Sequence, residues 1–74
     1  MECNVKLVWD NETGKWFTDT DDNLSLNLES GSFDALVERV RMAAPEMLEL
    51  NCGYTGTIKI NFEAVRTDNL ELVS

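Results

Sequence analysis

Polar and apolar residues alternate near the start of the chain, in segment 3–9, with a period of two that is typical of a half-buried β-strand. The apolar side of this segment consists of Val5, Leu7 and Trp9. Turn-forming residues follow at 10–14, ending in Gly14, and segment 15–20 is rich in bulky and β-branched side chains. The two segments are predicted to form a β-hairpin.

A third alternating segment contains Leu24, Leu26 and Leu28, and the polar residues 29–31 end it. We expect a third strand here with one apolar face. A fourth strand is predicted over residues 57–65, where apolar and polar positions alternate over nine residues. Its apolar side consists of Ile58, Ile60, Phe62 and Ala64. The polar segment 66–74 carries Leu70, Leu72 and Val73, which are candidates for a short fifth strand.

Helical spacing of apolar residues marks the middle of the chain and predicts a helix over about residues 33–50. Ser32 is a favourable N-cap, and either Asn51 or Gly53 is suited to the left-handed position after the helix. Pro45 removes a backbone donor, so we expect either a kink or a break there. The apolar face consists of Phe33, Leu36, Val37, Val40, Ala43 and Ala44.

The predicted order β-β-β-α-β defines one α+β domain spanning residues 1–74. Three meandering strands followed by a helical crossover give a four-stranded mixed sheet of order 3-2-1-4, because such crossovers are right-handed in nearly all proteins. The fourth strand then lies parallel to the first. The helix packs on one face of the sheet and leaves the other face open.

Charge and composition exclude several kinds of chemistry. The chain has 74 residues, 14 acidic and 6 basic side chains, no histidine and a net charge of −8. A basic nucleic-acid footprint is therefore absent, and so are Ser-His and Cys-His pairs. Two cysteines without histidine make no structural zinc site. We expect no enzyme activity, cofactor or metal, because a thin sheet with one helix offers carboxylates such as Asp10 and Glu12 little cleft.

The N-terminus does not resemble a signal peptide, and the longest apolar runs, such as Leu7–Trp9, are far too short to span a membrane. A cytoplasmic protein with reduced thiols at Cys3 and Cys52 is expected, although a disulfide between them is an alternative.

An acidic turn is the densest polar cluster, with Asp19, Asp21, Asp22 and Asn23. The spacing matches the first three ligand positions of an EF-hand loop, but Leu24 stands where that loop requires glycine. A solvated turn is therefore the preferred interpretation, and an acidic contact patch for a basic partner is the alternative.

The aromatic residues Trp9 and Trp16 flank the predicted hairpin. Cross-strand packing is the preferred interpretation, and an interface anchor is the alternative. Trp16 and Phe17 are adjacent, so one lies under the helix and the other on the open face, where it would favour a homodimer together with the apolar residues of segment 66–74. The candidate partner-binding residues are Trp9, Trp16, Asp19, Asp21 and Asp22.

Three stretches together resemble a small uncharacterised bacterial family with a HicB-like antitoxin fold. They are Val8–Trp16, with its Trp-Asp turn, the acidic Thr20–Asp22, and a helix that runs from Leu36 to the Ala-Pro-Glu-Met-Leu-Glu-Leu sequence at 44–50. The resemblance covers residues 5–51. Relatives carry Pro-Gly-Leu where this chain has Asn23-Leu24-Ser25, so contacts made by that loop do not transfer.

The resemblance implies the same β-β-β-α-β fold and a role as a protein-binding module. HicB-type antitoxins bind and block a small basic ribonuclease toxin, and full-length members also carry a C-terminal DNA-binding segment. Only residues 66–74 follow the fourth strand here, so we expect no DNA-binding segment and no direct contact with nucleic acid. The alternative is a stand-alone dimeric structural or assembly protein.

Overall fold

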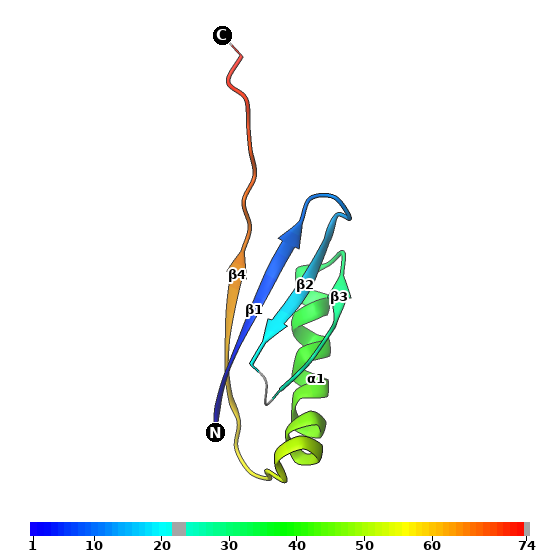
Figure 1. The fold of residues 1–74 in the computed structure, drawn as a ribbon, viewed down its shortest axis with the longest axis vertical. Helices are drawn as coiled ribbons and strands as arrows, with labels where there is room; N and C mark the ends of the chain where they lie inside the picture. Colours follow the sequence, from blue (N-terminus) through cyan, green and yellow to red (C-terminus); the bar gives the residue numbers. More distant parts are fainter. Residues whose placement is uncertain (22–23, 74) are drawn as a thin grey trace.

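The computed structural model describes residues 1–21 and 24–73. Its elements are β1 (Glu2–Asp10), β2 (Lys15–Thr20), β3 (Glu29–Ser30), α1 (Phe33–Cys52) and β4 (Lys59–Val65). The sheet has the order β3-β2-β1-β4, with β1 antiparallel to β2 and parallel to β4. The helix covers one face of the sheet (Figure 1). These findings confirm the predicted α+β class and strand order.

The core lies between β1 and the helix, and its pattern is the one read from the sequence. Val5 and Leu7 of β1 are fully buried, as are Leu36 and Val40 on the facing side of α1. The two-residue and 3.6-residue periods therefore bring their apolar sides to the same layer. Among the described residues, the buried apolar set is Cys3, Val5, Leu7, Leu24, Leu26, Leu36, Val40, Ala44 and Leu48.

Both ends of α1 are capped by the expected residues. The Ser32 hydroxyl accepts a hydrogen bond from the Ala35 N–H at 3.3 Å. Gly53 adopts φ 63°, and its N–H donates to the Glu49 carbonyl at 2.9 Å. A left-handed residue at this position satisfies helix carbonyls that have no partner within the helix.

The helix continues through Pro45 to Cys52, so the predicted alternative of a break at the proline is wrong, and the predicted end at residue 50 is two residues short. A proline inside a helix costs about 3 kcal/mol. Ala44 and Leu48 on either side of it are fully buried. Burying one leucine contributes about 1.5–3 kcal/mol, so packing of the last two turns offsets the loss at the proline.

The predicted third strand is wrong in position, because residues 24–28 form no strand and β3 contains only Glu29 and Ser30, which were predicted to end it. Leu24 and Leu26 are buried as expected, but they reach the core from an irregular segment. Ser25 between them has φ 46°, a left-handed conformation that interrupts an extended strand.

Threonine hydroxyls of β2 bind the backbone of this irregular segment. The buried Thr18 hydroxyl donates to the Leu26 carbonyl at 2.8 Å and accepts from the Leu28 N–H at 3.0 Å. The Thr20 hydroxyl accepts from the Leu26 N–H at 3.1 Å. Side chains thus replace part of the backbone ladder, which is why the backbone N–H and C=O groups of Leu26 and Leu28 have partners without strand geometry.

The predicted fifth strand does not form in the described segment 66–73, which leaves the domain as an extended tail in line with β4 (Figure 1). Leu70 is 88% exposed and Leu72 fully exposed. The tail contributes to a long molecule of 57 × 19 × 18 Å with a radius of gyration of 14.7 Å. A compact domain of this length would have a radius of about 11 Å.

Candidate functional site

Trp9 and Trp16 pack against each other on the face of the sheet that carries the helix. They are direct cross-strand neighbours, with ring centroids 5.4 Å apart in an edge-to-face arrangement. Phe33, at the start of α1, lies 5.0 Å from the Trp16 ring. Both tryptophans are half-buried. This geometry matches cross-strand packing, the interpretation that the sequence favoured for the two tryptophans.

The start of the tail is attached to this aromatic cluster. The Arg66 guanidinium lies 4.3 Å from the centroid of the Trp9 ring, within the range of a cation–π interaction. The Trp9 indole N–H donates to the Asn11 Oδ1 at 2.6 Å, and the Asn11 amide donates to the Thr67 carbonyl at 3.2 Å. Residues 66 and 67 are therefore held straight beyond the end of β4.

The acidic residues of the predicted site lie at the opposite end of β2 from Trp16. Asp19 lies opposite Lys6 on the open face, and the Asp21 carbonyl accepts hydrogen bonds from two backbone N–H groups three and four residues on. Asp19 lies three positions along the strand from Trp16, which corresponds to about 10 Å. Asp22 lies outside the described residues. The structure therefore does not gather the predicted residues into one site.

An apolar stripe crosses the open face of the sheet. Val8 is the direct neighbour of Phe17 on one side and of Val65 on the other, so the three side chains form one row. Phe17 is 40% exposed and Val65 39% exposed. The sequence predicted that Trp16 and Phe17 lie on opposite faces, and the structure shows that Phe17 is the one on the open face. Val8 and Val65 were missed, because only the register between strands brings them beside Phe17.

Carboxylates border the stripe. In the next row of the sheet, Lys6 stands between Glu63 and Asp19. Four other basic residues form ion pairs: Lys15 with Glu29 at 3.5 Å, Lys59 with Glu2 at 3.4 Å, Arg41 with Glu38 at 2.7 Å, and Arg66 with Asp68 at 2.9 Å. Further acidic side chains outside these pairs are exposed to solvent, namely Glu12, Asp19, Asp21, Asp34, Glu46, Glu49, Glu63 and Glu71.

Cys3 is buried in the core and Cys52 is exposed, and both are thiols. Burial raises the pKa of the Cys3 thiol, and the Asp21 carboxylate adds to this increase by repelling the thiolate. A raised pKa reduces the thiolate fraction at neutral pH, so Cys3 is a poor nucleophile. Within residues 1–21 and 24–73, no three Cys, Asp or Glu side chains gather as metal ligands would.

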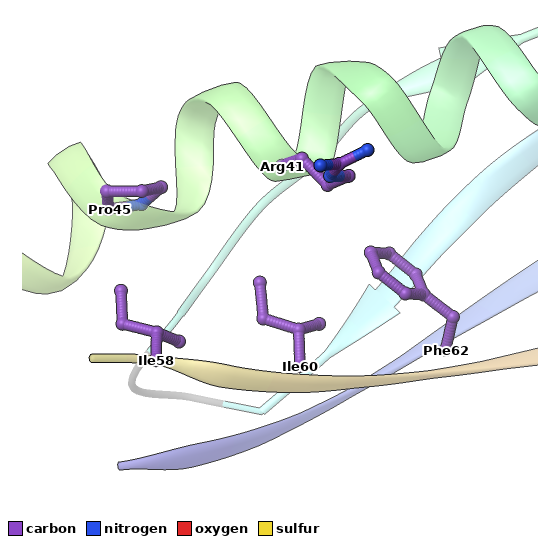
Figure 2. Close-up of a pocket in the computed structure, with 5 residues that line it drawn as sticks. All are labelled: Arg41, Pro45, Ile58, Ile60 and Phe62. Atoms are coloured by element: carbon purple, nitrogen blue, oxygen red, sulfur yellow. The ribbon is translucent and has the colours of Figure 1, made fainter.

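A groove of about 300 Å³ runs between α1 and β4 (Figure 2). Ile58, Ile60 and Phe62 point into it from the sheet side, and Arg41 and Pro45 line the helix side. The sequence placed these three side chains on the apolar side of their strand, and in the structure this side faces the helix, but the three are only half-buried. Periodicity does not show how far across the sheet a helix lies, so the groove was not predicted.

No helix in the described part of the chain is long and apolar enough to cross a membrane.

Comparison with known proteins identifies a family and a fold. A solved structure of a hypothetical protein from the extremely thermophilic bacterium Thermus thermophilus is similar, with 27% sequence identity and a TM-score of 0.77. The match covers 95% of this chain and all of the other. No curated protein matches the sequence. The model of a domain of unknown function, DUF1902, matches residues 2–72, nearly the whole chain, which confirms the expectation of an uncharacterised family. The chain therefore belongs to the DUF1902 family.

Proposed function

We propose that this protein is a non-catalytic binding module that uses the open face of its sheet to bind a basic partner protein. The observation that carries the proposal is the exposed apolar row of Val8, Phe17 and Val65, bordered by the carboxylates of Asp19 and Glu63. When a partner covers exposed aromatic and aliphatic side chains, the free energy falls and the complex is stabilised. Carboxylates at the rim select a partner of opposite charge and speed its approach.

The net charge of −8 supports the same partner class. The surface acids outnumber the bases that pair with them, so the field around the domain attracts cationic proteins and repels phosphate backbones. The resemblance to HicB-like antitoxins narrows the partner to a small basic ribonuclease, which the domain would mask without performing any reaction itself. Binding in the cytoplasm, without membrane or nucleic acid, is part of this proposal.

The test begins with purification of the tagged full chain from its native host at low salt and identification of a basic protein that binds it. The dissociation constant of the purified pair is then measured by calorimetry at two salt concentrations. The variant Asp19→Asn/Glu63→Gln removes two charges beside the stripe, and we expect at least tenfold weaker binding. The matched control Glu46→Gln/Glu49→Gln removes the same charge from α1 and should change the affinity less than twofold.

An equal loss of affinity in the two double variants would show that overall charge, and not the open face, determines binding. Failure to find any basic protein with micromolar affinity would reject the proposal. If the partner cleaves RNA, one equivalent of this protein should stop the cleavage.

A stand-alone dimeric protein is the second candidate function. It is favoured by a separate observation, the groove beside β4, whose outer edge has no strand next to it in the described sheet.

A further inference from the structure

The outer edge of β4 presents backbone groups for pairing. The Lys59 N–H donates to the Met1 carbonyl at 2.8 Å, so the odd-numbered residues of β4 direct their backbone groups toward β1. Residues in a strand alternate in this respect, so Ile60, Phe62 and Ala64 direct their N–H and C=O groups to the outer edge. No described segment pairs with that edge. An uncovered edge of this kind is a template for another strand.

The tail has the matching pattern. Arg66 lies over Trp9, on the face that carries the helix, and its side chain is paired with Asp68, two residues further on. Residues two apart in an extended chain share a face. Leu70 and Leu72 therefore lie on the same face of the extended chain as the even-numbered residues of β4 that line the groove. Both are almost completely exposed.

The tail does not reach the groove of its own chain. It leaves from the far end of β4, while the groove begins beside Ile58 at the near end (Figures 1 and 2). The contacts of Arg66 with Trp9 and of Thr67 with Asn11 hold the first tail residues in line with β4. The occupant must come from another molecule.

We propose that two copies of this chain dimerise by laying residues 66–72 of each copy antiparallel along the β4 edge of the other, so that Leu70 and Leu72 enter the partner's groove. A two-fold axis beside Val65 sets the register. Leu70 then lies opposite Ile60, and Leu72 lies opposite Ile58. The two sheets join into one, with both helices on the same face.

Charged pairs and apolar contacts at the two-fold axis favour this register. Glu71 lies opposite Lys59, and Asp68 lies opposite Phe62, next to which Arg41 lines the groove. On the open face, Val65 lies opposite the same residue of the second copy. The apolar stripe of each copy then meets the other at the axis, so one continuous row crosses the joined sheet.

Sedimentation equilibrium of the full chain tests the dimer. We expect a dimer at 10–100 µM, and at least a tenfold weaker dimer for Leu70→Ser/Leu72→Ser. The control Met42→Ser/Leu50→Ser removes two apolar side chains that are 76% and 80% exposed on the helix, and it should leave the dimer unchanged. A monomeric wild type, or a dimer that withstands the tail substitutions, would overturn the proposal.

Cysteine cross-linking in a Cys52→Ser background tests the register. Val65 lies at a pair without backbone hydrogen bonds, where Cα atoms are about 4.5 Å apart, a distance that a disulfide can span. Val65→Cys should therefore cross-link to itself, whereas Glu63→Cys and Thr67→Cys should cross-link only when mixed with each other. Self-cross-linking of Glu63→Cys with none at Val65→Cys would reject this axis. If the variant Leu70→Ser/Leu72→Ser is monomeric and still binds a basic partner, the dimer interface is independent of the proposed partner-binding face.

Discussion

Removal of the Thr18 hydroxyl is expected to destabilise the whole domain. Thr18 is 7% exposed, and its hydroxyl bonds to the backbone of Leu26 and Leu28, at 2.8 and 3.0 Å. Thr18→Val keeps the shape of the side chain but leaves the buried Leu26 carbonyl and the partly buried Leu28 N–H without these partners. Because this segment is not a regular strand, the hydroxyl takes the place of a backbone neighbour.

The size of the effect follows from the two lost bonds. A buried polar group left without a partner costs about 1–3 kcal/mol. The extra methyl group recovers part of this, so we expect a loss of about 2–4 kcal/mol. A domain of this length has a total stability of about 4–11 kcal/mol, so the substitution removes a large part of it. The melting temperature should fall by at least about 8 °C.

Urea unfolding followed by tryptophan fluorescence measures this loss, because Trp16 contacts both the sheet partner Trp9 and the helix. Thr18→Ser keeps the hydroxyl and loses only a methyl group, so its loss should be about 1 kcal/mol. Thr20→Val removes the single hydrogen bond to the Leu26 N–H, so its loss of unfolding free energy should lie between those of Thr18→Ser and Thr18→Val. A Thr18→Val protein within 0.5 kcal/mol of wild type would refute the role assigned to the hydroxyl.

Three further predictions concern the helix end, the tail and the core thiol. Gly53→Ala should cost about 1–2 kcal/mol in thermal unfolding because φ is +63° there, whereas Gly31→Ala, whose φ is not positive, should be near neutral. Arg66→Gln should cost about 0.5–1 kcal/mol of unfolding free energy and change tryptophan fluorescence, and unchanged emission would contradict the cation–π contact. The raised pKa of Cys3 means that the folded state holds the thiol proton more tightly than the unfolded state, whose pKa is about 8.5. The stabilising contribution of the bound thiol proton is therefore complete below the unfolded-state pKa and is lost as the pH rises through the folded-state pKa. Cys3→Ala should flatten the fall in stability as the pH rises above about 8.5.

Local periodicity was sufficient for most of the fold. The alternation in β1 and β4, the helical spacing of Leu36 and Val40, and the caps at Ser32 and Gly53 all predicted elements that the structure contains. These features depend on side chains close together in sequence, and the handedness of the crossover then left one economical strand order. The prediction of the third strand was wrong because alternating leucines indicate burial and not strand pairing. Burial does not require a backbone ladder when threonine hydroxyls supply the hydrogen bonds to the backbone.

The candidate surfaces were predicted only in part. The sequence by itself determined which side chains alternate, that Trp16 and Phe17 take opposite faces, and that the chain carries excess negative charge. Only the tertiary structure decided that Val8 joins Phe17 and Val65 in one row, and that the helix leaves a groove beside β4. Strand register and the lateral position of a helix depend on packing between residues far apart in the chain, and a local pattern holds no record of those contacts.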